Sequence, residues 1–470
     1  MTEEVSAGTS IPDRSVLAAP PSRRDRYAVG RAARERMPLD TLGVWDPSIR
    51  SHDALATVLD QNAGRVLSLV PIRLERMSAS AWSYYRGAAA VMAADLAALG
   101  HTGIDVQMGG DAHVLNFGLW ATPERQLSFD LRDFDETLRG PFEWDLKRYL
   151  ASLVVLARAT GLSERTATET VQGAVRTYRD RMSRYAAANE LDIWYDLVTS
   201  DQLLQALFEP EEREEVSARL RKRALRRTHT GAAPKLTRVV DGHLRIVDSP
   251  PNRTRLDHLL DGSGPAQVVT QAVQSYRDSL PYERRYLLDR FTFTDVVRQV
   301  VGVGSVGMQV YLVLLEGRHR DPLFLQVKQA GPSVYEPYLG SNPYPNHGQR
   351  VIKGKRLIQA ASDIFLGWTS AGGADFYVRQ FRDMKVIADA AIIAPFLVQF
   401  AEMCGAALAR AHARTGDAVA IDGYIGKGRR FDQAMIRFAS RYADQTSLDH
   451  AQLHNCAPPF DASGQRGSDR

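Results

Sequence analysis

The stretch Met108–Trp120, MGGDAHVLNFGLW, and the segment 127–150, LSFDLRDFDETLRGPFEWDLKRYL, place many polar groups among apolar residues. Asp111 and Asn116 lie five residues apart in the first, and the second holds six acidic residues. Buried carboxylates need cations, hydrogen bonds or a metal to offset their desolvation. The pair Asp111 and Asn116 therefore predicts a loop in which a carboxylate accepts a proton and an amide oxygen binds Mg²⁺.

Further carboxylates are expected beside that loop. The text LSFDLRDFDE predicts a β-strand that ends at Asp133, and Asp135 follows two residues later on the same side. We interpret Asn116, Asp133 and Asp135 as ligands of Mg²⁺, although surface carboxylates in turns would give the same pattern. Asp145, early in the next helix, is expected to accept backbone N–H groups of the loop, and Arg148 to form a weak surface pair with an acid of its own helix.

A glycine motif lies far downstream, in VGVGSVGMQVYLVLLEG at 301–317. Gly302, Gly304 and Gly307 have the spacing G-x-G-x-x-G between two segments of β-type residues. A dinucleotide-binding fold needs a helix after this motif, whereas MQVYLVLL predicts a strand. Strand, glycine turn and strand form the arrangement with which protein kinases cover ATP phosphates, here by the backbone from Gly302 through Ser305 to Gly307.

The next segment, PLFLQVKQA at 322–330, predicts an apolar strand that carries Lys328. A lysine on the strand after a glycine hairpin is the expected ligand of nucleotide phosphates, so Lys328 is a candidate catalytic and ATP-binding residue. Such a lysine usually pairs with a carboxylate on a following helix, for which Glu336 is the first candidate at the nucleotide site and Asp363 the second. The alternative is an edge-strand lysine that opposes aggregation.

Three other polar residues have two interpretations each. His113 lies inside the first segment, and we expect it to make hydrogen bonds rather than to act as a general base. Arg86 in SYYRGAA and Arg379 in YVRQF fit contacts with phosphates, and they fit structural ion pairs equally well.

Several blocks of the chain resemble a known family, the bacterial domain of unknown function 2252. The similarity is carried by GGDAHVLNFG with FDLRDFDETLRGPFEWDLKR, by RVIKGKRLIQAASDIFLGW, by FYVRQFRDMK and by ALARAHARTGD, over about residues 40–450. More distantly, the first block resembles aminoglycoside phosphotransferases and other protein-kinase-like enzymes. That resemblance implies that Asp111 is the catalytic base, that Asn116 and Asp133 bind Mg²⁺, and that Asp145 supports the loop.

Two features depart from the kinase pattern. Gly109 stands where those enzymes have the loop histidine, so another residue must make the packing beneath the loop. The chain order is also inverted, because the glycine turn and Lys328 follow the catalytic loop by nearly two hundred residues. A circular permutation reconciles this order with a single site, since function depends on where groups lie in space.

The expected fold class is α+β, as a two-lobed protein-kinase-like fold with a circular permutation and a largely helical insert. Changes of hydrophobic period and turn residues divide the chain. The expected parts are a mobile N-terminal arm at 1–35, a catalytic-loop and metal-binding part of the large lobe at 36–160, a helical insert at 161–290, a β-rich nucleotide-binding small lobe at 291–390, a helical part of the large lobe at 391–450, and a mobile tail at 451–470.

Composition limits the class of partner and the compartment. A formal charge of +4, from 59 basic and 55 acidic residues, leaves no footprint for nucleic-acid binding. The N-terminus lacks a secretory signal, no apolar run approaches the length needed to span a bilayer, and the two cysteines favour a reducing compartment. We therefore expect a cytoplasmic protein without membrane or nucleic-acid partners.

The candidate residues predict an ATP- and Mg²⁺-dependent phosphotransferase that acts on the hydroxyl group of an unidentified small molecule or protein. Three alternatives stay open: transfer of AMP from ATP on the same scaffold, a nucleotide-binding pseudokinase that regulates a partner, and a metal-dependent hydrolase that uses the acidic cluster. The hydrolase needs neither Lys328 nor the glycine turn, so a Lys328→Ala variant separates it from the other candidates.

Overall fold

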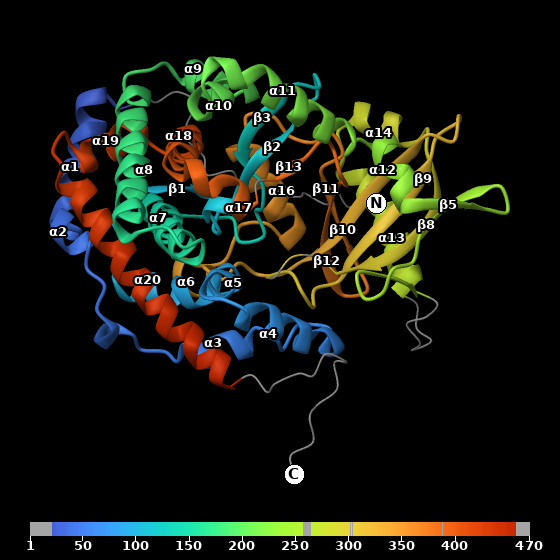
Figure 1. Ribbon diagram of the computed structural model, residues 1–470, viewed down its shortest axis with the longest axis horizontal. Coiled ribbons are helices and arrows are strands. Elements are labelled where there is room, and N and C mark those ends of the chain that lie inside the picture. The colour runs from blue at the N-terminus through green and yellow to red at the C-terminus, as the bar shows by residue number, and fades with distance from the viewer. Residues whose placement is uncertain (1–20, 257–264, 301, 303, 388, 457–470) are drawn as a thin grey trace, which may run out of the picture.

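The computed structural model describes residues 21–456 except 257–264, 301, 303 and 388. The fold is of the mixed α+β kind, and each pair of strands in the described ranges runs antiparallel. Figure 1 shows a large sheet at one end of the molecule and a helical body at the other, with a smaller sheet between them.

The large sheet has six strands and packs on both faces. Its strand order is β11-β12-β10-β9-β8-β7, with the bounds β7 Arg253–Arg255, β8 Thr292–Gln299, β9 Val310–Glu316, β10 Pro322–Ala330, β11 Gly367–Ala371 and β12 Ala374–Gln380. Leu312 and Leu314 of β9 belong to one apolar cluster, whereas Val313 and Leu315 belong to another. This alternation follows from the period of two in a strand, and it confirms the predicted strands on either side of the glycine turn.

Helices and a hairpin cover the two faces of this sheet. Their bounds are β5 Thr237–Val240, β6 His243–Ile246, α12 His229–Leu236, α13 Pro265–Tyr276 and α14 Tyr282–Leu288. Tyr276 packs on one face, while Leu236 and Ile246 pack on the other. The hairpin β5–β6 turns at Asp241 and Gly242, both with positive φ, as an Asp-Gly turn requires.

The helical body is built around α7, which is buried along nearly its whole length. Its main helices are α7 Phe142–Ala159, α8 Glu164–Tyr185, α18 Leu397–Thr415 and α20 Arg430–Cys456. Helices α8, α18 and α20 all pack on α7, and α18 also packs along α8. The predicted helices that begin at Phe142 and end before Gly416 are confirmed.

One stretch, Ala390–Thr415, is long and apolar enough to cross a membrane by length and composition, contrary to our expectation that no run approached that length. Half of its apolar window is buried inside the protein. Its side chains Phe400, Cys404 and Leu408 lie in the main core, so packing within the helical body accounts for the apolar composition.

The remaining elements complete the body and hold the loops. The helices are α1 Arg23–Arg36, α2 Leu39–Leu42, α3 Ala54–Asp60, α4 Val70–Ser78, α5 Ala81–Gly87, α6 Ala89–Ala98, α9 Glu190–Tyr195, α10 Ser200–Leu207, α11 Pro210–Leu225, α15 Glu336–Leu339, α16 His347–Ile358, α17 Ala390–Ile393 and α19 Ala418–Ile425. The strands are β1 Asp105–Met108 paired with β4 Leu138–Pro141, and β13 Val386–Ile387, β2 Phe117–Ala121 and β3 Leu127–Leu131 in one sheet.

Both ends of the described chain are more ordered than we expected. The arm predicted at 1–35 contains α1, which begins after the N-cap Ser22 and packs against α19, while residues 1–20 lie outside the described residues. Gly30 makes this contact possible, because a Cβ there would lie 1.9 Å from the Ala420 carbonyl oxygen. The tail predicted at 451–470 is helical to Cys456, where α20 ends, and its remainder lies outside the described residues.

The segment 161–290, expected as one helical insert, contributes to the core of the helical body and to the clusters on both faces of the large sheet. Val171 and Tyr178 of α8 and Leu203 of α10 belong to the core of the helical body. Ala272 and Tyr276 of α13 belong to the cluster beneath the large sheet. The helices of this segment are therefore integral to both parts of the fold.

Candidate active site

The acidic loop after β3 meets the lysine-bearing strand β10. Lys328 forms an ion pair with Asp135, which is 193 residues away in sequence, and the Lys328 side chain is only 2% exposed. Tyr377, the cross-strand neighbour of Lys328 on β12, donates a hydrogen bond of 2.7 Å to the other oxygen of Asp135. The two distant segments therefore meet in the structure, as the hypothesis of a single site requires.

The expected partners of Lys328 are wrong. Glu336 instead accepts hydrogen bonds from the Ser333 amide and the Asn342 side chain, each 3.0 Å long. Asp363 accepts the amides of Phe365 and Gln380. Helix α16, HGQRVIKGKRLI, the first long helix after β10, carries no acid at all, which was a sign in the sequence that the partner comes from another element.

Arg350 of α16 holds the acidic loop against β10. Its guanidinium donates to the backbone carbonyls of Asp135 at 2.7 Å, Thr137 at 2.6 Å and Gly331 at 2.8 Å. These three bonds join the loop after β3 to the end of β10, so the Asp135 side chain is presented directly to Lys328. The sequence analysis did not identify Arg350.

The opposite charges at this junction stabilise the ionised forms of Lys328 and Asp133. Burial opposes the charge of Lys328, but Asp135 and the neighbouring Tyr377 and Asp133 outweigh it and raise the lysine pKa. Burial likewise opposes ionisation of Asp133, but Lys328 and Arg379 outweigh it and lower the pKa of this carboxyl. The lysine is therefore cationic and Asp133 anionic at neutral pH.

Asp145 supports the first loop as predicted. Its carboxylate accepts the backbone N–H groups of Gly109 at 2.6 Å and Gly110 at 2.9 Å. A Cβ on Gly109 would lie 2.8 Å from Cδ2 of buried Leu131, so a larger side chain would displace the core there. His412 of α18, fully buried, approaches the other side of this support, with its Nε2 3.4 Å from Asp145 Oδ2.

Asp111 has a buried cationic partner, which corrects the expectation of a weak surface pair for Arg148. The Arg148 guanidinium is 1% exposed and donates to Asp111 Oδ1 at 2.7 Å. Burial nevertheless raises the pKa of Asp111, because the desolvation of its carboxylate outweighs the attraction of Arg148. A carboxylate with a raised pKa is a better proton acceptor than an exposed one.

Asn116 ties the two loops together. Its side-chain amide donates to the carbonyls of Asp111 at 2.8 Å and Asp133 at 3.1 Å, and its carbonyl oxygen accepts the Asp133 N–H at 3.0 Å. The oxygen retains one lone pair, since an amide carbonyl can accept two hydrogen bonds. The amide thereby fixes Asp111 and Asp133 side by side.

The oxygen atoms available at this junction fit a metal ion that takes few ligands from the protein. The Oδ1 atom of Asp133 is buried without a hydrogen-bond partner, and the free lone pair of Asn116 belongs to the same junction. Asp135 has both oxygens engaged by Lys328 and Tyr377, so it would have to release one of them to join. Within the described ranges, no three His, Cys, Asp or Glu side chains can hold a metal by themselves. Mg²⁺, which is often held by one or two carboxylates and substrate phosphates, matches Asp133 with Asn116.

The glycine turn joins β8 to β9 and docks on the helical body. Gly302 and Gly307 have positive φ angles of 70° and 91°. Arg65 donates to the carbonyls of Gly304 at 2.8 Å and of Val306, and Arg76 donates to the Gly302 carbonyl at 2.7 Å. A Cβ on Gly304 would lie 3.5 Å from the Arg86 carbonyl oxygen, so the turn adjoins α5. Ser305 lies half-buried within this turn.

Arg86 and Arg379 lie near the carboxylates without forming ion pairs in the described part of the chain. Arg86 has a buried Nε without a partner, and burial lowers the pKa of its guanidinium. Arg379 donates to the neutral Gln326 at 2.9 Å. The alternative of structural ion pairs is therefore not observed, and both guanidinium groups keep donors for another anion.

His113 makes no hydrogen bond through Nδ1, contrary to our expectation. Its Nε2 is 3.9 Å from Asp111, beyond hydrogen-bond distance, and its ring packs edge-on against Trp82. Burial, with Arg86 and Arg148 nearby, holds the pKa of His113 well below its ordinary value. The ring is therefore a neutral packing group.

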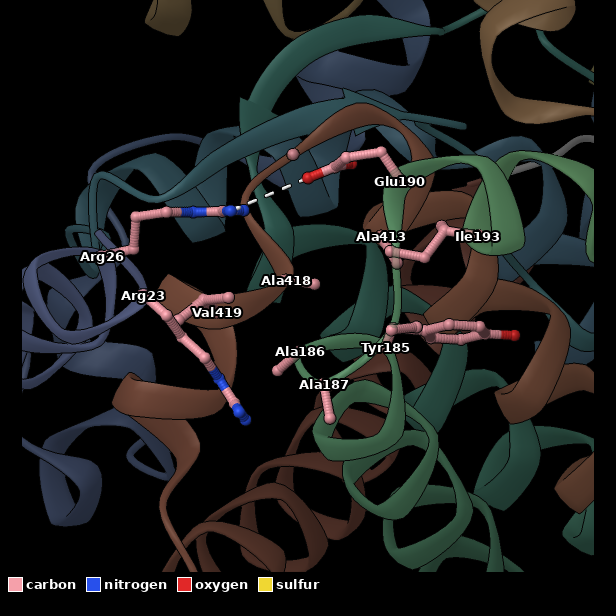
Figure 2. Close-up of a pocket in the computed structure, with 12 residues that line it drawn as sticks. Arg23, Arg26, Tyr185, Ala186, Ala187, Glu190, Ile193, Ala413, Ala418 and Val419 are labelled. Atoms are coloured by element: carbon pink, nitrogen blue, oxygen red, sulfur yellow. Dashed lines mark ion pairs between the residues drawn. The ribbon is translucent and has the colours of Figure 1, made fainter. Parts of the chain in front are cut away.

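A cavity of about 190 Å³ lies elsewhere, among α1, α8, α9 and α19. Figure 2 shows Arg23, Arg26, Tyr185 and Glu190 around it. Arg26 is paired with Asp417 at 2.9 Å and with Glu190 at 3.7 Å, so its charge is satisfied. None of the predicted site residues lines this cavity.

Comparison with known protein families gives one result that covers most of the chain. Residues 65–456 match the family model described as an uncharacterized protein conserved in bacteria (DUF2252). No curated protein and no solved structure matched the chain. The matched range contains both acidic loops, the glycine turn and Lys328, so the whole candidate site lies inside it. The chain belongs to the DUF2252 family of bacterial proteins.

Proposed function

We propose that this protein is an ATP- and Mg²⁺-dependent phosphotransferase with a circularly permuted, protein-kinase-like fold. The ion pair between Lys328 and Asp135 carries the proposal, because it joins the strand after the glycine turn to the loop of Asp133. The acceptor would be a hydroxyl group on a small molecule or a protein, and we propose a cytoplasmic location. The unpartnered oxygen of Asp133 supports the Mg²⁺ part of the proposal.

In the proposed step, the acceptor oxygen attacks the γ-phosphorus of ATP, the bond to the β,γ-bridging oxygen breaks, and ADP leaves. Asp111 takes the hydroxyl proton, which its raised pKa favours. Lys328 exchanges Asp135 for phosphate oxygens, and the glycine turn covers the phosphates with backbone. Asn116 and Asp133 would hold Mg²⁺, which supplies charge neutralisation at the phosphate oxygens.

A nucleotide-binding pseudokinase is the second candidate. The observation that favours it is the buried Arg148, which neutralises the carboxylate expected to act as the base. A regulator needs the phosphate cradle but no proton acceptor. It would show nucleotide-dependent stabilisation without turnover.

The test is incubation of the protein with Mg²⁺ and either γ- or α-labelled ATP. We expect the wild type to transfer the γ label or release it to water, and Asp111→Asn to lose at least a hundredfold of this rate while it still binds ATP. Asp105→Asn, which changes an exposed carboxylate on β1, serves as the matched control and should keep the wild-type rate.

The other outcomes separate the candidates. Transfer of the α label identifies AMP transfer, and ATP binding without any transfer identifies the pseudokinase. Full activity of Lys328→Ala with loss of activity in Asp133→Asn would identify the metal-dependent hydrolase. An Asp111→Asn variant as active as the wild type contradicts the assigned base.

A further inference from the structure

Four cations gather beside Asp133 without carboxylate partners. Arg132 follows β3, Lys355 lies on α16, Arg379 on β12 and Lys385 immediately before β13. None of the four forms an ion pair with an acid among the residues that the structure describes. Elsewhere in the site, by contrast, Lys328 has a carboxylate partner.

Their observed contacts are with neutral groups. Arg132 donates to a backbone carbonyl at 2.8 Å, and its buried Nε has no partner. Arg379 donates to Gln326, and the Lys355 ammonium lies 5.9 Å from the centre of the Phe134 ring. Unpaired cations at this depth are costly, so their collection at one place needs an explanation.

The two carboxylates that line the cavity beside this cluster are engaged by other groups. Arg132, Lys355 and Lys385 line a small cavity together with Asp363 and Asp383. Asp363 accepts two backbone amides, and Asp383 accepts Arg125 at 2.6 Å. The cluster therefore keeps an excess of positive charge.

The like charges act on each other. Burial, with Arg379 nearby, lowers the pKa of Lys355 to about 8. Burial, with Arg379 and Lys355 nearby, holds the pKa of Lys385 well below its ordinary value. A bound anion would relieve this repulsion and restore the charge of both lysines.

The sheet places this cluster in line with Lys328. Gln326 and Lys328 point to the same face of β10, and their cross-strand partners on β12 are Arg379 and Tyr377. Arg379 therefore lies on the same face as Lys328, beside a position of β10 that is two residues further from the glycine turn. Several cations beside one another match the several anionic oxygens of an oligophosphate better than a single carboxylate.

We propose that Arg132, Lys355, Arg379 and Lys385 form an oligophosphate-binding site beside Asp133. The cavity has a volume of about 20 Å³, room for about one water, so the phosphates would bind at its rim. Arg132, Arg379 and Lys385 are half-buried, so each keeps part of its side chain accessible to a ligand. Binding of an oligophosphate at this site does not require the proposed phosphotransferase activity. Only the identity of the molecule that carries the phosphates rests on the proposed function.

Two molecules offer this chemistry in the proposed reaction. The terminal phosphates of ATP could occupy the cluster, which would leave the α-phosphate beside Asp133 and make AMP the transferred group. The phosphate of an already phosphorylated acceptor could occupy it instead, with ATP held by Lys328 and the glycine turn. Both sources present the same oxygens to the cations.

The test uses inorganic tripolyphosphate without Mg²⁺, measured by calorimetry and by thermal unfolding. We expect the wild type to bind and to be stabilised, and Lys355→Met and Lys385→Met to bind at least tenfold more weakly. Lys427→Met, which changes an exposed lysine, is the matched control and should bind like the wild type. Lys355→Met without ligand should unfold at a higher temperature than the wild type, which also shows that it folds.

Unchanged tripolyphosphate affinity in both lysine variants, or no binding to the wild type, overturns the proposal. Titration with ATP then separates the sources. A loss of ATP affinity equal to the loss for tripolyphosphate assigns the cluster to the nucleotide, whereas retained ATP affinity assigns it to a phosphorylated acceptor. A wild type that transfers no label would refute the phosphotransferase while leaving the tripolyphosphate result intact, so the two failures are distinguishable.

Discussion

At the scale of single residues, the acids of the segment 127–150 each have a separate role. Asp130 pairs with Arg410 in the core, and Asp135 pairs with Lys328. The other partners are the Val334 amide for Glu136, the Thr102 amide and hydroxyl for Glu143, and the loop amides of Gly109 and Gly110 for Asp145. Asp133 alone of the six keeps a buried oxygen without a hydrogen-bond partner in the described chain, which makes it the strongest candidate for a ligand contact.

Lys147 gives a prediction for the dependence of stability on pH. It is 1% exposed on α7, its ammonium lies 4.5 Å from the centre of the Phe438 ring, and burial lowers its pKa from 10.5 to about 8. Below pH 8 the residue is charged in both the folded and the unfolded state, so the folded state carries the full cost of about 3 kcal/mol. Above pH 10.5 it is neutral in both states and the cost vanishes.

Lys147→Met should therefore raise the free energy of unfolding by up to about 3 kcal/mol at pH 7, and by progressively less between pH 8 and 10.5. Urea denaturation at several pH values measures this difference. Lys222→Met, on an exposed face of α11, should have no such effect. A destabilised Lys147→Met at pH 7 would show that the ammonium has a favourable partner in the fold.

At the scale of elements, helix α16 connects the sheet to the acidic loops. Arg350 near its beginning binds three carbonyls at the junction, and Lys355 one and a half turns later joins the cation cluster. Both side chains are almost fully buried. The helix therefore determines the relative position of Asp135 and Lys328.

Arg350→Met should loosen this junction, because three buried or partly buried carbonyls lose a charged donor. We expect a loss of roughly 2–4 kcal/mol of stability and faster hydrogen exchange at the amides of 133–137. Arg356→Met is the control on the same helix, since Arg356 donates to the Leu366 carbonyl away from the loop. Equal exchange rates at 133–137 in both variants would contradict the role of Arg350.

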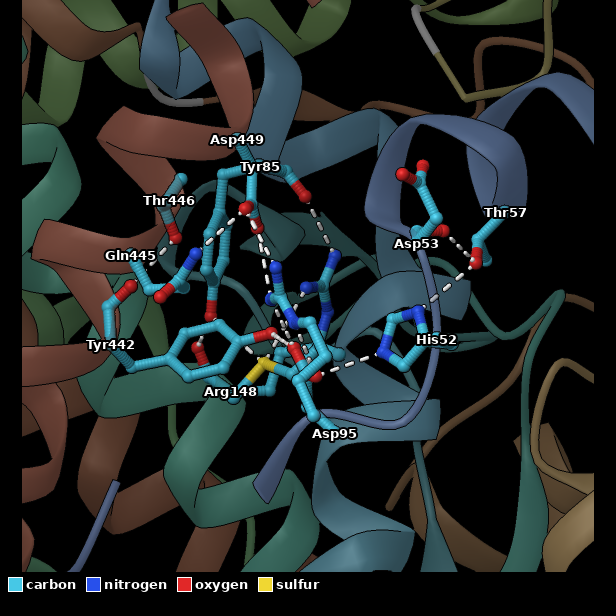
Figure 3. Close-up of polar contacts among 12 residues, drawn as sticks. His52, Asp53, Thr57, Tyr85, Asp95, Arg148, Tyr442, Gln445, Thr446 and Asp449 are labelled. Carbon is cyan, nitrogen blue, oxygen red and sulfur yellow. Dashed lines mark hydrogen bonds and ion pairs between the residues drawn. The ribbon is translucent and has the colours of Figure 1, made fainter. Parts of the chain in front are cut away.

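At the scale of the whole molecule, a buried network joins the segment just before α3 to the last helix. Arg50 bridges Asp95 of α6 and Asp449 of α20, which is 399 residues away, and the latter bond is 2.7 Å long. Figure 3 shows Asp95, Tyr442 and His52 around this bridge, and both tyrosine and histidine contact Asp95. The network holds the N-terminal segment against α20.

Arg50→Met should leave two buried carboxylates without the guanidinium that bridges them. We expect a loss of roughly 3–5 kcal/mol in the free energy of unfolding, seen as a lower urea midpoint. Arg31→Met, on an exposed position of α1, should unfold like the wild type. If Arg50→Met also matched the wild type, water or a rearranged partner would be compensating for the lost charge.

Local pattern was sufficient for the elements and for one supporting residue. PLFLQVKQA is β10 from its first residue to its last, because a buried strand needs an apolar run of this length. Asp145 was identified because a carboxylate in the first turn of a helix lies near backbone N–H groups. The sequence analysis missed the ordered helix α1, because its charged, alanine-rich sequence is also typical of a mobile arm. Its packing partner α19 became known only from the structure.

The sequence by itself determined the α+β class, most helices and strands and the glycine turn, and it singled out Lys328 and Asp135, which the structure brings together. Only the tertiary structure decided which residues form ion pairs. Lys328 pairs with Asp135 rather than with Glu336, and Asp111 pairs with the buried Arg148. The physical reason is that spacing encodes neighbours within a helix or strand, whereas contacts across nearly two hundred residues depend on how the sheet and the helical body pack.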